Sequence, residues 1–228
     1  MKSIQHIFFD LDHTLWDYNR SAKETLSEIF DLLELFDSGN TADDFFNVFD
    51  EVNNYLWCLY NQGKIDRKHI QRNRFKEILE KLGVNTERSL EASNYFMTHC
   101  PSKPYLMPDS MTALRYLSEK YSLHIITNGF QDSQKKKLKS SGVKDFFCQV
   151  ITSECTGSRK PSREIFNYSL SQAGASLSDS IMIGDNAKTD ILGAKNVGMK
   201  SVFYDPSGRK KSLADYTIQS HLELIKLF

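Results

Sequence analysis

The spacing of apolar residues divides the chain into three stretches of different character. Residues 4–9 (IQHIFF) form a short apolar run that ends in the acidic loop DLDHTL, as a buried central strand would. From about Ser21 to Cys100 the apolar residues recur at helical spacing. From Pro104 onward, strand-like and helix-like runs alternate. The pattern therefore predicts one strand, then a helical block, then a mixed α/β region.

The helical block has no strand signals. Its apolar residues fall into three periodic groups: Ala22, Leu26, Ile29, Phe30 and Leu33; Phe45, Val48, Phe49, Val52, Leu56 and Leu59; and Phe75, Ile78, Leu79 and Leu82. Thr41 and Asp66 suit helix N-caps, and Gly83 suits a helix end. We therefore expect a helical domain over residues 16–104, inserted after the first strand.

The last stretch alternates in the manner of βαβ units. Its pattern predicts strands at 122–127, 147–152, 180–184 and 200–204, and helices at 109–120, 131–141, 161–173 and 188–197. Such alternation implies a parallel sheet with helices on both faces. We therefore expect an α/β fold in which residues 1–15 and 105–228 form a Rossmann-like, doubly wound sheet of strand order 3-2-1-4-5.

Composition excludes several classes of function. The 29 Lys and Arg residues balance 29 Asp and Glu residues, so no global field attracts a nucleic acid polymer or an anionic membrane. No apolar run is long enough to cross a bilayer, and the N-terminus is too acidic for a signal peptide, which favours a cytoplasmic protein. The four cysteines lack metal or redox spacing and are expected to be reduced core thiols. Monomer and dimer both stay open.

Polar residues cluster where the predicted strands end. They are Asp10 and Asp12 after the first strand; Thr127, Asn128 and Gly129 after the second; Lys160 before the helix after the third; and Asp185 and Asp190 after the fourth. Ligands of open α/β sheets bind beyond these strand ends, so we expect these residues to converge. Carboxylates crowded into one crevice repel each other and demand a cation. Oxygen-only ligands favour Mg²⁺ over zinc.

Taken singly, each of these residues has an ordinary structural explanation. Asp10 suits a turn, Thr127 to Gly129 a strand-to-turn signal, and Lys160 before Pro161 a helix start, while Asp190 suits a first helical turn. Their combination favours a catalytic site over these structural roles.

Two other groups are interpreted separately. The run Lys135 to Lys137 is explained by a solvated helix face. Trp16 and Asp17 directly follow the acidic loop, where we expect substrate contacts.

Four segments, in order, carry a family resemblance. FFDLDHTLWD, IITNG, KPSREIF and IMIGDNAKTD resemble the four motifs of the haloacid dehalogenase superfamily, and the helical insertion resembles the C1 cap of its subfamily I. His13 and Asn186 replace residues that are commoner in related proteins, but no catalytic group is missing. The resemblance implies a Mg²⁺ cofactor and a small-molecule phosphate monoester as substrate.

The resemblance also implies roles for the aspartates. Asp10 would be the nucleophile, and Asp12 would protonate the leaving oxygen and then activate water. Asp185 would bind Mg²⁺ together with a carboxylate oxygen of Asp10 and the backbone carbonyl of Asp12. Asp190 would act indirectly, by orienting a metal-bound water or Lys160.

The remaining matched residues would bind the substrate phosphate. Thr127 would hold the transferring phosphoryl oxygens together with the amides around Asn128 and Gly129. Lys160 would neutralise charge on the same group and on Asp10.

Several functions remain open at this stage. The motif forms are most similar to those of the nucleotidase group that hydrolyses pyrimidine and non-standard nucleoside monophosphates, and N-acylneuraminate-9-phosphatase has the same plan. A sugar-phosphate phosphatase or a phosphomutase would keep all four motifs. Haloacid dehalogenases lack the second aspartate, so Asp12 disfavours that reaction, and the intact motifs disfavour a non-catalytic binding protein.

Overall fold

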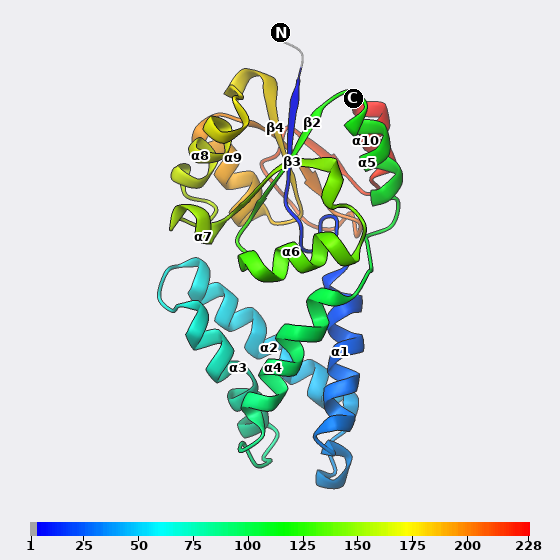
Figure 1. Cartoon of the computed structure of the whole chain (residues 1–228), viewed down its shortest axis with the longest axis vertical. Coiled ribbons are helices and arrows are strands. Elements are labelled where there is room, and N and C mark those ends of the chain that lie inside the picture. Colours follow the sequence, from blue (N-terminus) through cyan, green and yellow to red (C-terminus); the bar gives the residue numbers. More distant parts are fainter. Residues whose placement is uncertain (1–3) are drawn as a thin grey trace. The chain divides into compact units, whose positions relative to one another are not determined.

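The computed structural model describes residues 4–228, and this chain divides into two compact units (Figure 1). The larger unit consists of the described residues up to Tyr18 together with Pro104–Phe228. The smaller unit is Asn19–Lys103.

The larger unit is built on a six-stranded parallel sheet of order β3-β2-β1-β4-β5-β6. Its strands are β1 (His6–Phe9), β2 (Ser122–Thr127), β3 (Phe147–Thr152), β4 (Ser180–Gly184), β5 (Lys200–Tyr204) and β6 (Tyr216–Ile218). The predicted α/β fold and strand order are confirmed, and β6 extends the sheet by one short strand beside β5. In β1, the side chains of Ile7, Phe8 and Phe9 are fully buried, as expected of a central strand covered on both faces.

Helices cover both faces of this sheet. They are α5 (Ser110–Ser118), α6 (Gln131–Ser140), α7 (Ser153–Thr156), α8 (Arg163–Ala173), α9 (Leu192–Val197) and α10 (Leu222–Leu227), with short turns η3 (Lys144–Phe146), η4 (Leu177–Asp179) and the π-helical η5 (Ala187–Ile191). Figure 1 shows α8 beside α9 on one side of the sheet and α5 beside α10 on the other. On the α8 side, Phe166 packs in one buried cluster with Phe8 and Met182, which joins this layer to the central strands.

The smaller unit is entirely helical over its described residues. It contains α1 (Tyr18–Leu32, which begins at the last residue of the larger unit), η1 (Leu35–Ser38), α2 (Ala42–Asn61), α3 (Arg67–Lys81), α4 (Ser89–His99) and η2 (Cys100–Ser102). Thr41 and Asp66 are the N-caps of α2 and α3, as predicted, because each side chain accepts a hydrogen bond from a backbone N–H of the first turn. Gly83 follows α3 with a φ of 69°, a conformation that glycine adopts without strain.

The core of the helical unit is aromatic. Phe49 lies with its ring centroid 6.0 Å from that of Phe75 and 5.2 Å from that of Phe96. The guanidinium of Arg74 is buried among these rings, 4.4 Å from the centroid of Phe96, and donates to Oδ1 of Asn53. Delocalised charge over aromatic faces makes such burial tolerable.

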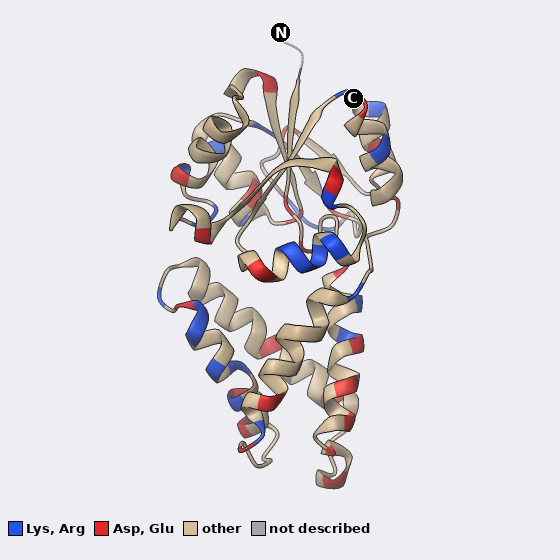
Figure 2. Ribbon diagram, viewed as in Figure 1, with Lys and Arg blue, Asp and Glu red and all other residues tan. Residues whose placement is uncertain are grey.

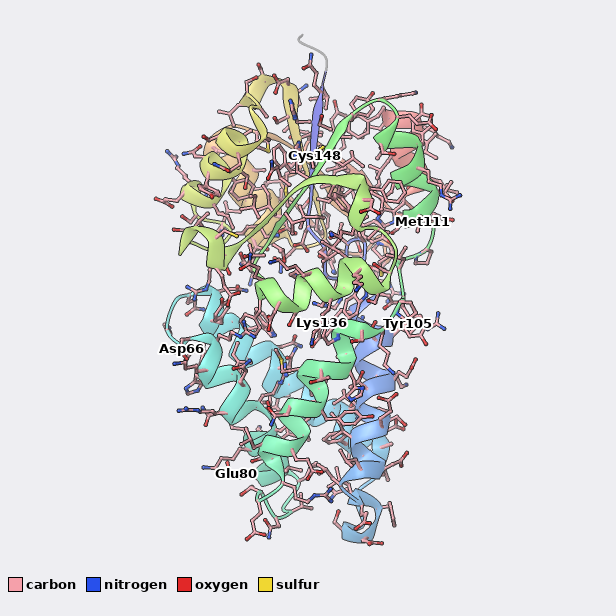
Figure 3. All side chains as sticks on the ribbon, viewed as in Figure 1. Asp66, Glu80, Tyr105, Met111, Lys136 and Cys148 are labelled. Carbon is pink, nitrogen blue, oxygen red and sulfur yellow. The ribbon has the colours of Figure 1, made fainter. Side chains whose placement is uncertain are left out.

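Two further expectations concern membranes and thiols. No helix within residues 4–228 is long and apolar enough to cross a membrane. All four cysteines are free thiols, but the expectation that they belong to the core is wrong for Cys58, Cys148 and Cys155, which are exposed. Cys148, labelled in Figure 3, lies on β3, and the position of β3 at the sheet edge accounts for its exposure.

Candidate active site

The site is built around Asp10 and Lys160, at the carboxyl end of β1. Asp10 follows the strand directly, and its backbone N–H donates to the carbonyl of Ile183 in β4. Asp10 is buried, with 8% of its surface exposed. Nζ of Lys160 lies 2.6 Å from Oδ1 of Asp10, 2.7 Å from Oδ1 of Asp190 and 2.8 Å from the carbonyl oxygen of Ile126. An ammonium has three N–H donors, so these three acceptors fix Lys160 completely.

Asp12 is held by a different set of partners. Nζ of Lys137 lies 2.6 Å from Oδ1 of Asp12, and Nε2 of Gln134 donates to Oδ2 at 2.9 Å. Both donors come from α6. Burial by itself would raise the pKa of Asp12, but the charge of Lys137 and the hydrogen bonds from both side chains lower it below its ordinary value.

The turn after β2 contributes Thr127, Asn128 and Gly129. Oγ1 of Thr127 accepts hydrogen bonds from the N–H of Gly129 at 3.0 Å and from Nε2 of Gln134 at 2.7 Å. The Asn128 side chain bonds the backbone of Lys160 at both ends, since Oδ1 accepts from its N–H at 2.8 Å and Nδ2 donates to its carbonyl at 3.0 Å. Asn128 therefore joins this turn to the segment that carries Lys160.

Gly129 leaves space that another side chain fills. A Cβ atom at this position would lie 2.1 Å from Nε2 of Gln134, which is far inside van der Waals contact. The absence of a side chain at Gly129 therefore permits Gln134 to reach both Thr127 and Asp12.

Asp185 and Asp190 approach from the end of β4. Oγ1 of Thr14 donates to Oδ1 of Asp185 at 3.2 Å and accepts from the Asp185 N–H at 3.1 Å, which connects the two acidic loops. Asp190 lies in η5 and is fully buried, with Oδ2 accepting from the N–H of Asn186 at 3.0 Å. Asn186 also caps η5, because its Oδ1 accepts from the backbone N–H groups of Lys188 and Thr189.

Asp10, Asp185 and Asp190 together form a carboxylate cluster. Each offers one oxygen, and these three oxygens lie within 4.8 Å of one another. Burial raises the pKa of Asp10 well above its ordinary value, with Lys160 opposing the shift and the other two aspartates adding to it. Burial, with Asp190 next in effect, raises the pKa of Asp185 to about 7. One lysine does not balance three clustered carboxylates, so a hard divalent cation fits this oxygen-only set.

The structure thus brings together every residue that the sequence singled out at the strand ends, and adds three. Thr14, Gln134 and Lys137 contact the aspartates directly. The interpretation of Lys137 as part of a solvated face is wrong, because Lys137 is 7% exposed whereas Lys135 and Lys136 are exposed. Figure 2 shows the basic stretch along α6, and Figure 3 labels Lys136 on the same helix. Gln134, Lys137 and Leu138 share the buried face of α6 at helical spacing, but the sequence does not say that this face meets the acidic loop.

Trp16, which follows the acidic loop, lies beside Lys137. Its side chain is fully buried, and Nζ of Lys137 lies 4.7 Å from its ring centroid. His13 has a φ of 62°, in the left-handed region that Gly, Asn and Asp adopt more readily than most other residues.

Comparison with known proteins agrees with this geometry. Residues 4–198 match the family model described as haloacid dehalogenase-like hydrolase. The chain is 32% identical to pyrimidine 5'-nucleotidase YjjG of Escherichia coli over 97% of this chain and 96% of that protein. It is 30% identical to glyceraldehyde 3-phosphate phosphatase of Pyrococcus furiosus over 100% of this chain and 94% of that protein. The solved structure of the HAD-hydrolase YfnB of Bacillus subtilis, bound to magnesium, superposes with a TM-score of 0.90 at 25% identity, over 99% of both chains. This chain belongs to the haloacid dehalogenase-like hydrolase family.

Proposed function

We propose that this chain is a Mg²⁺-dependent phosphomonoester hydrolase that works through an aspartyl-phosphate on Asp10. One observation carries the proposal most: Asp10 meets Asp185, Asp190 and the buried Lys160 at the end of the central strand, with Asp12 two residues further on. A carboxylate nucleophile needs a partner that handles protons and a site that tolerates extra negative charge. Asp12 offers the first, and Lys160 together with a bound divalent cation would offer the second.

Asp10 and Asp12 divide the chemistry. A carboxylate oxygen of Asp10 attacks phosphorus while the bond to the leaving oxygen breaks. Asp12, which is ionised in the free protein and takes up a proton when the substrate binds, gives that proton to the leaving oxygen. Asp12 then takes a proton from a water molecule, whose oxygen attacks phosphorus and breaks the bond to Asp10. Inorganic phosphate leaves, and both carboxyl groups return to their starting states.

Thr127, the amides of Asn128 and Gly129, and Lys160 bind the phosphoryl group in this proposal. Because all three N–H groups of Lys160 are already engaged, it acts chiefly through its charge and by fixing Asp10. Asn128 supports this role, since its side chain holds the Lys160 backbone on both sides.

Asp10, Asp185 and the backbone carbonyl of Asp12 would hold the magnesium ion. When bound, Mg²⁺ neutralises charge on the carboxylates and on the phosphoryl oxygens. Asp190 is better suited to an indirect role, because Oδ1 is paired with Lys160 and Oδ2 accepts from the backbone of Asn186. We also propose that the helical unit is the cap domain, residues 16–104, that the sequence predicts.

The substrate that we favour is a nucleoside 5'-monophosphate of the pyrimidine type. Support comes from the 32% identical relative, which is named a pyrimidine 5'-nucleotidase. A sugar phosphate is the second candidate, because a 30% identical relative is named a glyceraldehyde 3-phosphate phosphatase. N-acylneuraminate 9-phosphate and a phosphomutase reaction complete the alternatives within phosphoryl transfer. The dehalogenase reaction is disfavoured by Asp12.

A phosphate-release panel at fixed Mg²⁺ tests the proposal. It should include UMP, dUMP, dTMP, hexose phosphates, glyceraldehyde 3-phosphate and acylneuraminate 9-phosphate. We expect a pyrimidine nucleotide to exceed the hexose phosphates by at least about tenfold in kcat/KM, equivalent to roughly 1.4 kcal/mol of transition-state binding. A sugar phosphate at the head of the panel would overturn the nucleotidase assignment alone. If no monoester in the panel releases phosphate, the proposal that this chain is a phosphomonoester hydrolase is wrong.

A further inference from the structure

The geometry points to Lys137 and Gln134 of α6 as positioning residues, which hold the Asp12 carboxylate in place for its two proton transfers. This inference rests on the proposed function, because it assigns a purpose to Asp12. It gives α6 a part in the proposed reaction, although the basic run of this helix, Lys135 to Lys137, has the sequence of an ordinary solvated surface.

Both carboxylate oxygens of Asp12 are engaged, each by a different side chain. Lys137 contacts Oδ1 at 2.6 Å, and Gln134 contacts Oδ2 at 2.9 Å. Two contacts on two oxygens fix the rotation of the carboxylate plane as well as its position, which one contact alone would not do. The partners lie 122 and 125 residues away in the chain, so tertiary structure, not local sequence, aims Asp12.

Lys137 is itself fixed by its surroundings. Nζ lies 4.7 Å from the ring centroid of Trp16 and 5.9 Å from that of Tyr18, and the residue is 7% exposed. An ammonium over aromatic faces has little water around it, so its attraction for Asp12 is weakly screened.

Gln134 connects Asp12 to the phosphate-binding turn. Its Nε2 donates both to Asp12 and to Oγ1 of Thr127, at 2.9 and 2.7 Å. The amide orientation is dictated by Asp12, because an ionised carboxylate only accepts hydrogen bonds. As a result, Oε1 of Gln134 is buried with no hydrogen-bond partner among residues 4–228.

That unsatisfied oxygen argues against a purely structural role. A buried acceptor without a partner destabilises the fold, and an apolar side chain of similar size would remove the penalty. The glutamine is nevertheless accommodated, and the missing Cβ of Gly129 makes room for it. The free energy of unfolding is therefore lower than it would be with an apolar side chain here. In return, Nε2 of Gln134 donates hydrogen bonds to both Asp12 and Thr127.

The test is a double-mutant cycle between Lys137 and Asp12. Lys137→Met keeps the length and burial of the side chain but removes the ammonium. We expect kcat for a substrate with a poor leaving group, such as UMP, to fall by about 10- to 100-fold, within the range that general acid–base catalysis supplies, with KM changing less than about threefold. In an Asp12→Ala background the same substitution should change kcat by less than about threefold, since no carboxylate remains to be aimed. Lys136→Met, on the exposed face of α6, is the matched control and should leave kcat unchanged.

The leaving group gives an independent readout. With an activated aryl phosphate, which needs little protonation of its leaving oxygen, Lys137→Met should slow formation of the phosphoenzyme far less than it does with UMP. Gln134→Met repeats the experiment with a neutral change if Lys137→Met fails to fold, and should give the same pattern with a smaller loss.

Three results would overturn the inference: wild-type kcat in both α6 variants, equal losses from Lys137→Met with and without Asp12, or a fall in stability with kcat intact. The proposed function fails differently. In that case wild-type protein releases no phosphate, or Asp12→Ala retains full turnover, whatever the α6 variants do.

Discussion

Nζ of Lys160 lies 2.6 Å from Oδ1 of Asp10, although 150 positions separate the two residues in the chain. The same ammonium bonds Asp190 and the carbonyl of Ile126, so one cation joins the ends of β1 and β2 to the turn after β4. Burial would lower the pKa of Lys160, but Asp10 and Asp190 raise it above its ordinary value. Lys160 therefore stays charged, and it fixes the proposed nucleophile rather than competing with it for protons.

Asp10→Asn should abolish turnover while preserving the fold. The amide keeps an oxygen that can accept from Lys160 and removes one of three crowded carboxylates, so thermal stability should equal or exceed that of the wild type. Phosphate release should fall by at least about a thousandfold, as expected for loss of a nucleophile. Asp145→Asn, on the exposed turn η3, is the control. Activity within about tenfold of wild type in Asp10→Asn would rule out the covalent mechanism.

Removal of a proposed magnesium ligand should be visible without any activity assay. Mg²⁺ should raise the Tm of the wild-type protein, because it relieves repulsion among buried carboxylates, and Asp185→Asn should reduce this rise to a small fraction. Titration of Mg²⁺ in a thermal-shift experiment measures both effects. Calcium should restore EDTA-treated enzyme less well than magnesium, because it takes more ligands at longer distances. An unchanged Tm response in Asp185→Asn would remove Asp185 from the metal site.

Gly184→Ala should damage the site from within the sheet. A Cβ atom there would lie 2.3 Å from Oδ2 of Asp190, and Asp190 cannot retreat easily because it is fully buried and paired with Lys160. We expect a loss of about 1–3 kcal/mol in the free energy of unfolding, the usual range for overpacking, together with reduced turnover. Urea denaturation measures the first and phosphate release the second. If the free energy of unfolding and the rate of phosphate release both equal those of the wild type, Asp190 can move without effect on the fold or the site, and the prediction is wrong.

Much of the fold followed from local patterns. Strands β2, β3, β4 and β5 begin and end at the predicted residues, because each is a short apolar run bounded by polar or glycine-containing turns. Strand β6 was missed, since three residues are too few to show a period. The predicted helix at 161–173 begins later, at Arg163, because Ser162 accepts from the N–H of Glu164 as the N-cap and displaces Pro161 from the first turn.

The site was only partly predictable. Residues at strand ends could be found because parallel strands bring their carboxyl ends to one edge. Lys137 and Gln134 could not be found that way, because they lie in mid-helix and reach the site across tertiary contacts. Within the run Lys135 to Lys137, the buried Lys137 cannot be told from its exposed neighbours, because sequence alone does not say which face of α6 meets the acidic loop.

The most direct measurement looks for the phosphoenzyme itself. In Asp12→Ala, an activated aryl phosphate should still phosphorylate Asp10, but the water that would remove the phosphoryl group loses its base. Intact-mass spectrometry shortly after mixing should show a phosphoryl adduct, and borohydride reduction followed by peptide mapping should locate it at Asp10. The adduct should be absent when Asp10→Asn is added to the variant. Sustained turnover of the aryl phosphate by Asp12→Ala with no adduct, or an adduct on another residue, would contradict the aspartyl-phosphate mechanism.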